Sequence, residues 1–372
     1  MNKIAQKVPQ GNNGKTEVKG KKSVVREWLD AIVFAVIAAT IIRALFLEAF
    51  MIPTPSMERS LLVGDYLFVS KFHYGTRTPQ TPLQIPLTFQ KIWGTEIPAY
   101  LEWIDLPMFR LPGFSEIRRN DPVVFNVPHD LENPVDMRTY YIKRCVGIAG
   151  DTLKINNQQV YINGVPAETK PGMQSSYFLK TSQVINQKVF KRNKITDIYR
   201  AEGGYVVQTT AATAEKLKVL GFIEAIEPII YEKGVAYGAA YFNESGFNHW
   251  NIDNFGPLYI PEAGASLEVN EQFIANYGHL VKHYEHHHEV EVKEDKLFIE
   301  GQEIKRYTFQ QDYFFMMGDN RHNSLDSREW GFVPMDHIVG KALITWWSVD
   351  EQESFANILD KIRWNRIFRG IE

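Results

Sequence analysis

The sequence predicts a mainly β protein, an antiparallel β-barrel or sandwich that an inserted second region interrupts and one N-terminal transmembrane helix precedes. A long apolar stretch near the N-terminus predicts the helix. Short runs of alternating or β-branched residues follow it, on both sides of a middle region that lacks them. Aromatic residues make up 13% of the 372 residues, which suits a β-rich chain.

The apolar stretch runs from Trp28 to Leu47 and reads WLDAIVFAVIAATIIRALFL. As a helix, a segment of this length would span roughly 30 Å, the thickness of a bilayer core. Asp30 and Arg43 are its only charges, and each lies near one end, where a side chain can reach the interface. A cleavable signal peptide is the alternative, but the run is long for one and continues as EAFMIP, without a small-residue cleavage site. We therefore expect an uncleaved anchor at residues 23–50.

Residues 1–22 form a polar tail that is too poor in hydrophobic residues to fold. Basic residues dominate the tail and the start of the anchor, where Lys15, Lys19, Lys21, Lys22 and Arg26 stand against Glu17 and Glu27. By the positive-inside rule, this tail is cytoplasmic and the chain after the anchor lies outside.

Strand-like segments then occupy residues 65–72, 122–127, 151–165 and 295–304. We expect hairpin turns at Asn156-Asn157 and at Glu300-Gly301. Many short strands with turns between them favour a barrel or sandwich over a parallel α/β sheet. The β domain would comprise two parts, residues 51–167 and 291–350.

The remaining segments differ from this pattern. Residues 168–290 carry a predicted helix at Ala211–Leu220, loop-like stretches and no catalytic signature, so we expect an inserted accessory region there. Residues 351–372 form an amphipathic C-terminal segment, which would either lie on the membrane surface or dock on the β domain.

Net charge and cysteine content give limited information about partners and cellular compartment. The formal net charge of −3 gives no case for a nucleic-acid partner. With one cysteine, Cys145, the chain forms no internal disulfide, which fits a reducing compartment or an extracytoplasmic protein built without disulfides.

Ser56 is the first candidate for catalysis. It lies in FMIPTPSMERSLLVGD directly after the anchor, where Pro53 and Pro55 favour an extended, stiff backbone and Thr54 supplies a nearby hydroxyl. The sequence around it contains neither a G-x-S-x-G elbow nor an S-x-x-K motif. Taken alone, such a serine is more typical of a turn or a helix cap.

Lys143 is the second candidate, in the aromatic and apolar segment TYYIKRCVGIAGD. A lysine that acts as a base must be neutral, and burial can lower its pKa from about 10.4 by roughly 3–5 units. The alternative is a strand on which Lys143 and Arg144 both face water.

The third segment spans residues 314–342 and begins as an apolar strand, FFMMGDNRHNSLDSREWGFVPMDHIVGKA. After Met317 it is dense in polar residues that can hydrogen-bond locally, which predicts a well-ordered loop. Composition alone would place this loop on the surface.

Together these segments resemble bacterial type I signal peptidases (leader peptidases), a family of Ser–Lys dyad serine proteases. P-T-P-S-M-E-R-S-L matches the family's nucleophile box, Y-I-K-R-C-V-G-I-A-G-D its lysine box, and G-D-N-R-H-N-S-L-D-S-R-E-W-G-F-V-P its C-terminal box. R-N-D-P-V-V-F (119–125) resembles the intervening strand box. The boxes follow in family order behind an N-terminal anchor, and the resemblance covers residues 24–165 and 290–345.

The resemblance implies a membrane-anchored serine endopeptidase that removes N-terminal signal peptides and cleaves after small residues of the Ala-x-Ala type. Ser56 would be the nucleophile and Lys143 the general base, while the Ser56 amide and the Thr54 hydroxyl would form the oxyanion hole. Ser324 would orient Lys143 by a hydrogen bond, Asp326 and Arg328 would form a bracing ion pair, and Gly318, Asp319 and Asn320 would shape the wall. Shallow substrate pockets would be lined by Phe50, Ile52, Met57, Leu61, Tyr141 and Ile142.

The resemblance also implies partners and a location. The partners would be precursor proteins with signal peptides, the lipid bilayer and the secretion translocon, and no cofactor is expected. The chain would cross the bacterial inner (cytoplasmic) membrane once, with its N-terminus in the cytoplasm and its catalytic domain on the periplasmic side.

Two residues depart from the common family pattern. His322 stands where many relatives have an acid, and it would either alter the local pH response or, as we expect, face solvent. Thr54 stands where the oxyanion hydroxyl is often a serine, a change that should preserve the function.

The histidine-rich stretch HYEHHHEVEV, residues 283–292, invites a metal interpretation. It lacks an H-E-x-x-H motif, so we expect no physiological metal site. Three alternatives to the peptidase remain: a soluble self-cleaving repressor, a metal-dependent hydrolase, and a non-enzymatic envelope scaffold. The anchor opposes the first, the histidine spacing opposes the second, and the presence of Ser56, Lys143 and Ser324 opposes the third.

Overall fold

We describe the protein from a computed structural model, which covers residues 23–371 except 86, 87, 89, 102, 104, 105 and 351–357. The predicted tail at residues 1–22 therefore lies outside the described residues.

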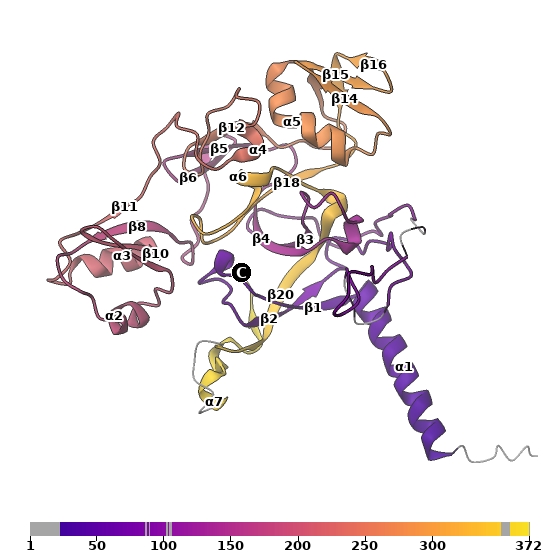
Figure 1. Cartoon of the computed structure of the whole chain (residues 1–372), viewed down its shortest axis with the longest axis horizontal. Coiled ribbons are helices and arrows are strands. Elements are labelled where there is room, and N and C mark those ends of the chain that lie inside the picture. The colour runs from indigo at the N-terminus through magenta and orange to yellow at the C-terminus, as the bar shows by residue number, and fades with distance from the viewer. Residues whose placement is uncertain are drawn as a thin grey trace, which may run out of the picture.

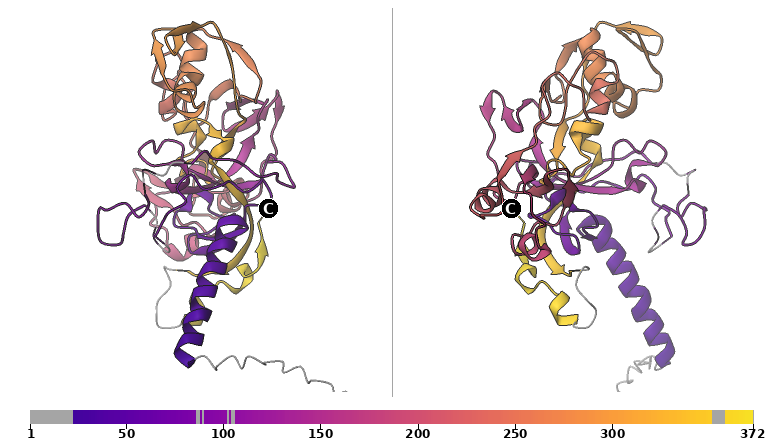
Figure 2. Two further views of the ribbon diagram at one scale, coloured as in Figure 1. Left: turned by 90° about the vertical axis from the view of Figure 1, so that its right-hand side faces the viewer. Right: turned by 60° about the vertical axis from the view of Figure 1, so that its left-hand side comes forward.

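The N-terminal helix α1 spans Val24–Leu45 and projects away from the body of the molecule (Figures 1 and 2). Ser23 caps its first turn, and none of its residues is buried by the rest of the chain. It is long and apolar enough to cross a membrane, a test that a signal sequence also passes. The helix ends before Leu47, where the apolar stretch ends, and before residue 50, the predicted limit of the anchor, because Leu47 begins strand β1. Arg43, near that end, forms an ion pair with Glu48 at 2.8 Å.

An eight-stranded sheet forms the centre of the body, in the order β1-β2-β20-β3-β4-β18-β19 with β21 beside β20. Its paired strands are antiparallel, which confirms the predicted mainly β, antiparallel fold. The strands are β1 (Leu47–Met51), β2 (Asp65–Ser70), β3 (Pro122–Asn126), β4 (Tyr140–Gly147), β18 (Tyr313–Met317), β19 (Val333–Pro334), β20 (Ile338–Ser348) and β21 (Arg369–Gly370).

A second layer of structure stands above this sheet in Figure 1. It contains a four-stranded sheet in the order β12-β5-β6-β7, the helix α5 (Glu271–Tyr284) and the small sheet β14-β15-β16. Strand β12, from the predicted insertion, pairs with β5 of the preceding segment, so the two share one hydrophobic core. The further elements are β5 (Thr152–Asn156), β6 (Gln159–Ile162), β7 (Val165–Pro166), α4 (Ala240–Asn243), β12 (Phe255–Tyr259), β13 (Ser266–Glu268), β14 (Val290–Lys293), β15 (Lys296–Ile299), β16 (Gln302–Ile304), β17 (Arg306–Thr308) and α6 (Ser327–Trp330).

Residues 175–228 form a compact unit with its own core, which we call the accessory module. Its sheet has the order β11-β8-β10-β9 and lies to one side of the body (Figure 1). The predicted helix at Ala211–Leu220 is present as α3 (Ala211–Lys218), capped by the Thr210 hydroxyl. Its other elements are β8 (Ser175–Lys180), α2 (Gln187–Arg192), β9 (Ile198–Ala201), β10 (Gly204–Thr209) and β11 (Ala225–Pro228).

Of the two predicted hairpin turns, one is confirmed and the other is displaced by one residue. Glu300-Gly301 is the turn between β15 and β16, and both residues have positive φ, as a tight hairpin turn requires. The first hairpin turns one residue later than predicted, at Asn157-Gln158, because Asn156 pairs with Gln159. Asn157 and Gln158 both adopt positive φ, which asparagine tolerates well and glutamine less so.

The described part of the C-terminal segment, residues 358–371, docks on the β domain. It forms α7 (Ile358–Lys361), the 3-10 turn Trp364–Arg366 and strand β21. Arg366 is buried, forms an ion pair with Asp65 and donates to the Ser60 carbonyl at 2.9 Å. Trp364 and Phe368 remain exposed.

Candidate active site

Ser56 lies in a three-residue 3-10 turn, Pro55–Met57, that follows strand β1. Pro55 starts the turn without an N–H group, a place where helical turns tolerate proline well. The Ser56 amide belongs to the first residues of the turn, which have no acceptor within it. Its side chain is almost buried, with 8% of the residue exposed.

Lys143 approaches Ser56 from the middle of strand β4. Its Nζ lies 2.8 Å from Ser56 Oγ and 3.2 Å from the carbonyl oxygen of Ile142. Burial lowers the pKa of Lys143 to about 8, against the opposing effect of the Asp326 and Asp319 charges. The alternative in which Lys143 faces water is therefore wrong, and the amine is placed to exchange a proton with the serine hydroxyl.

Arg144, the next residue, is also buried, and its guanidinium pairs with the carboxylate of Asp319, which follows the neighbouring strand β18. It donates to the two carboxylate oxygens of Asp319 at 2.8 and 2.6 Å and to the Asn120 carbonyl at 2.6 Å. This fork-to-fork pairing fixes Asp319 beside strand β4.

Residues 318–324, which we call the active-site loop, follow strand β18 and pass against the nucleophile. The Asn320 amide donates to the Ser56 carbonyl at 3.0 Å, and its side chain donates to the Pro55 carbonyl at 3.2 Å. A Cβ on Gly318 would lie 2.6 Å from the Ser56 carbonyl oxygen and 2.2 Å from Ser324 Oγ, so only glycine fits there.

Asp326 and Arg328 form a buried ion pair at 2.8 Å behind the loop. The Asp326 carboxylate also accepts the Gly318 amide at 3.0 Å, and the Arg328 charge holds the pKa of Asp326 below its usual value despite burial. Ser324 Oγ is buried and has no hydrogen-bond partner among the described residues. Among the described residues no hydrogen bond joins Ser324 to Lys143, unlike the predicted arrangement.

A cavity of about 490 Å³ opens beside Ser56 and Lys143. Its lining is mostly apolar and includes most of the predicted pocket residues, namely Phe50, Ile52, Met57, Tyr141 and Ile142, together with Thr54. Leu61 does not line it: this residue is fully buried, in the same core cluster as Ile52 and Met57. The structure thus places Leu61 in the core and not on the cavity wall, because it packs against strands β2, β3 and β20.

The cavity also has lining residues that sequence reasoning missed. Asn323 lies near the end of the active-site loop and Leu325 directly after it, while Tyr140 starts β4 and Thr139 precedes it. Leu325 adjoins Ser324, a predicted site residue, and this position could have suggested that Leu325 lines the cavity. No sequence signal placed Asn323 in the cavity.

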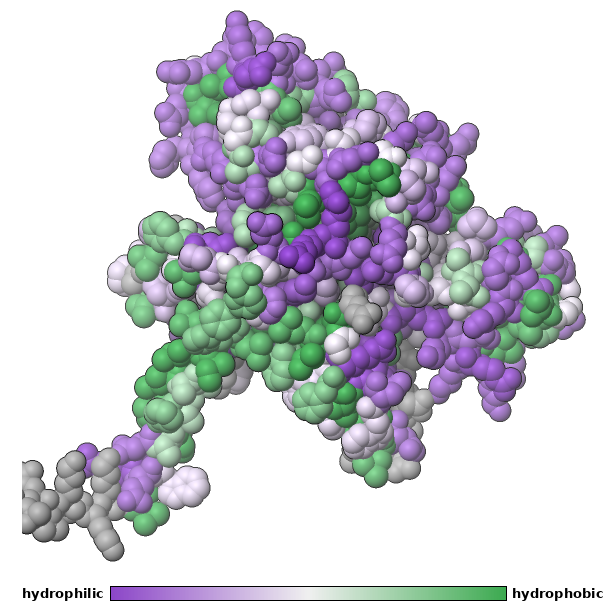
Figure 3. Space-filling model, turned by 180° about the vertical axis from the view of Figure 1, so that it is seen from behind, coloured by the Kyte–Doolittle hydropathy of each residue, from purple (hydrophilic) through white to green (hydrophobic). Residues whose placement is uncertain are grey.

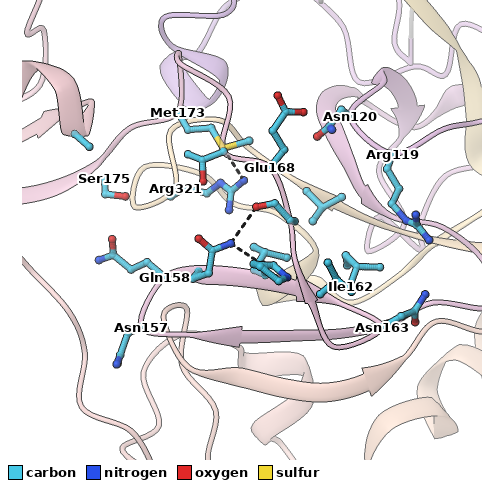
Figure 4. A pocket seen from close by; sticks show the side chains of 18 of the residues that line it. Arg119, Asn120, Asn157, Gln158, Ile162, Asn163, Glu168, Met173, Ser175 and Arg321 are labelled. Carbon is cyan, nitrogen blue, oxygen red and sulfur yellow. Dashed lines mark hydrogen bonds between the residues drawn. The ribbon is translucent and has the colours of Figure 1, made fainter.

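A larger cavity of about 720 Å³ lies elsewhere, between strands β6 and β7 and the start of the accessory module. Arg321 points into it and donates to the Met173 sulfur at 3.1 Å, as Figure 4 shows. Neither Ser56 nor Lys143 lines this cavity, so its size does not make it the site of peptide hydrolysis.

The side chain of His322 is buried, and the prediction of a solvent-facing histidine was wrong. Its side chain is only 4% exposed. The Ser176 amide donates to its Nδ1 at 2.8 Å, so its proton lies on Nε2, which donates to Asp253 at 2.9 Å. The sequence concealed this because both partners come from the region that bears no family motif.

The histidine-rich stretch holds no metal-ligand cluster within the part of the chain that the structure describes. His286 instead contacts Asp336 at 2.9 Å, and His287 contacts the Tyr307 hydroxyl at 2.8 Å.

This geometry can be compared with known proteins. A family model described as signal peptidase, peptidase S26, matches residues 25–209 and 262–347, which include nearly all of α1, Ser56, Lys143 and the active-site loop. The chain belongs to this family. The unmatched residues 210–261 include α3, β11 and α4.

Individual relatives match over most of their length. The chain is 25% identical over 360 residues to a signal peptidase I of Helicobacter pylori (strain ATCC 700392 / 26695), covering 92% of this chain and 91% of that protein. It is 26% identical over 376 residues to a signal peptidase I of Rickettsia massiliae (strain Mtu5), covering 96% of each. A third relative, from Buchnera aphidicola subsp. Schizaphis graminum (strain Sg), is 25% identical over 316 residues, 84% of this chain and 72% of that signal peptidase I. Family membership makes the chain a serine endopeptidase of the signal peptidase I type.

Proposed function

We propose that Ser56 and Lys143 form the catalytic dyad with which the chain cleaves signal peptides from precursor proteins. The observation that carries the proposal is the 2.8 Å contact between Lys143 Nζ and Ser56 Oγ, in a site where burial lowers the lysine pKa to about 8. A buried lysine with a depressed pKa can serve as a general base near neutral pH.

In this mechanism neutral Lys143 accepts the Ser56 hydroxyl proton while Oγ attacks the scissile carbonyl carbon. The tetrahedral intermediate collapses when the same ammonium group protonates the leaving amine of the mature protein. An acyl ester then links Ser56 to the signal peptide. Lys143 next deprotonates a water molecule that hydrolyses the ester and restores the free enzyme.

The Ser56 amide and the Thr54 hydroxyl would stabilise the oxyanion. Both residues line the cavity, and Pro55 between them has no N–H group to compete for the substrate carbonyl. The Asn320 amide and side chain hold the carbonyls of Ser56 and Pro55, so the turn that presents these donors is fixed before substrate arrives.

The apolar cavity would select small residues at the cut. Phe50, Ile52, Tyr141 and Ile142 line it, and it has space for alanine-sized side chains beside the dyad. An extended signal peptide with alanine one and three residues before the scissile bond would place both methyl groups on this surface, because alternate residues of a strand face the same side.

We further propose that α1 anchors the chain in the bacterial inner membrane, with the body outside the cytoplasm. Ser56 follows α1 after a single short strand, β1, which would keep the nucleophile close to the membrane surface where precursors emerge from the secretion translocon. In Figure 3 hydrophobic surface runs along α1 and onto the part of the body that adjoins it.

The test is cleavage of a precursor that carries an Ala-x-Ala site, with full-length protein purified in detergent. Wild type should cut after that site, and Ser56→Ala and Lys143→Ala should not. Lys154→Ala, which changes an exposed lysine on β5, is the matched control and should cut normally. A folded wild type that cuts none of several precursors would favour the envelope-scaffold alternative, and an active Lys143→Ala would exclude the dyad.

A further inference from the structure

The accessory module and the residue directly before it, Gln174, form hydrogen bonds with the active-site loop. The Gln174 amide, just before β8, donates to the Asp319 carbonyl at 2.9 Å, and the Arg321 amide donates back to the Gln174 carbonyl at 2.9 Å. The Ser176 amide on β8 donates to His322 at 2.8 Å. These bonds place the module directly behind the residues that touch Ser56.

Asp197 makes the contact that reaches furthest into the site. It lies between α2 and β9, and its Oδ2 accepts the side-chain amide of Asn323 at 2.8 Å and that of Asn320 at 3.4 Å. A carboxylate that accepts two amide N–H groups forms charge-assisted hydrogen bonds, which are stronger than neutral ones.

The two asparagines connect Asp197 to both sides of the reaction centre. Asn323 lines the cavity beside Ser56 and Lys143. Asn320 holds the backbone of the nucleophile through the carbonyls of Pro55 and Ser56. A single carboxylate from the module thus bridges the wall of the substrate cavity and the turn that carries the nucleophile.

The module holds Asp197 firmly enough for this role. The Asp197 carbonyl accepts the Gln208 amide of β10 at 3.1 Å, and Ile195, two residues before it, is buried in the module's core. A second attachment lies nearby, where Arg59, three residues after the nucleophile, donates to the Asn193 carbonyl at 2.8 Å.

We propose that Asp197 is a positioning residue of the active site, and that the accessory module serves to fix the active-site loop against the nucleophile through it. This inference rests on the proposed function, because it concerns the same reaction centre. It gives a role to a region that carries no catalytic signature.

The test is a double-mutant cycle between Asp197 and Asn323 in the full-length protein, measured on the Ala-x-Ala precursor. Asp197→Ala should lower kcat about tenfold with KM changed less than about twofold, the size of one lost charge-assisted hydrogen bond near the nucleophile. Asp197→Asn keeps an acceptor oxygen and should recover most of the loss. Combining Asp197→Ala with Asn323→Ala should cost clearly less than the product of the single effects.

Glu215→Ala is the matched control, since it removes an exposed acid of the same module that pairs only with Lys218 among the described side chains. Wild-type kcat is expected for it. Wild-type kinetics for Asp197→Ala, or multiplicative effects in the cycle, would overturn the proposal.

Hydrogen–deuterium exchange supplies a readout that does not need turnover. The amides of the active-site loop, including Asn320, should exchange faster in Asp197→Ala than in wild type, while those of β20 should not change. If wild type fails to cut any precursor, the proposed function is wrong, yet unchanged exchange in the loop would separately refute the role of Asp197.

Discussion

Burial changes the acid–base behaviour of the Lys143 amine. Its position on β4, between β3 and β18, removes the amine from water, and the cost of desolvating a cation lowers its pKa to about 8. Arg144, one residue further on, is also buried, but its guanidinium forms an ion pair with the Asp319 carboxylate. Two adjacent basic residues on one strand thus differ: Lys143 has a lowered pKa, and Arg144 forms a buried ion pair.

The first prediction concerns the pH dependence of cleavage. Because the base must be neutral, kcat/KM of the free enzyme should rise as pH increases from about 6 and should level off above the Lys143 pKa of about 8. Initial rates with limiting precursor between pH 6 and 10 measure this. A profile that is flat across this range would contradict Lys143 as the base.

The second prediction concerns stability. Since the folded-state pKa of Lys143 is lower than the unfolded one, the unfolded chain binds the extra proton, and the resulting destabilisation is fully present below about pH 8 and fades as pH rises toward about 10.5. Lys143→Met should therefore be inactive yet more stable by about 1–2 kcal/mol at pH 7. Thermal unfolding in detergent at pH 7 and pH 10 tests this, and an equal gain at both values would count against the explanation.

At the scale of elements, the active-site loop depends on close backbone approach. It runs from β18 past the 3-10 turn of Ser56, and Gly318 leaves no room for a side chain between the two. The buried Asp326–Arg328 pair closes the far side of the loop. The loop and the turn therefore form one rigid unit.

The third prediction tests this approach with Gly318→Ala. The added methyl group meets the Ser56 carbonyl, a backbone atom that cannot move without moving the nucleophile, so kcat should fall by about 100-fold or more. Gly221→Ala, where a Cβ meets nothing within 4 Å, should behave as wild type. Precursor cleavage and thermal unfolding of both variants are the measurements, and full activity in Gly318→Ala would exclude the tight contact.

At the scale of the whole molecule, one apolar helix and a large β body suggest a division between membrane and water. The accessory module and the layer around α5 lie at the far side of the body from α1 in Figure 1. This arrangement would leave those regions in the aqueous compartment while Ser56 stays near the bilayer.

The fourth prediction is the orientation of the chain, which the lone cysteine makes easy to measure. Cys145 is fully buried, and burial raises its thiol pKa, so it should not react with a membrane-impermeant thiol reagent. In spheroplasts, Glu215→Cys on the exposed side of α3 should be labelled, whereas Lys15→Cys in the tail should be labelled only after lysis. The reverse pattern would invert the proposed topology.

The sequence by itself determined the features that short contiguous segments encode. The apolar run predicts α1, the alternating runs predict β2 and β3 of the central sheet as well as β5, β6, β15 and β16, and the family resemblance of the motifs around Ser56, Lys143 and Gly318 implies which segments meet. The predictions of helices and strands succeed because hydrophobic periodicity and local backbone chemistry act over a few residues.

Only the tertiary structure decided which side chains meet across large separations in the chain. The burial of the His322 side chain against Asp253 and the bond from Asp197 to Asn323 depend on how the middle region packs, and the placement of Leu61 in the core depends on its packing against strands β2, β3 and β20. No local pattern encodes such contacts, because each is the joint result of many weak interactions between segments far apart in sequence. The role of the accessory module therefore became visible only once the chain was folded.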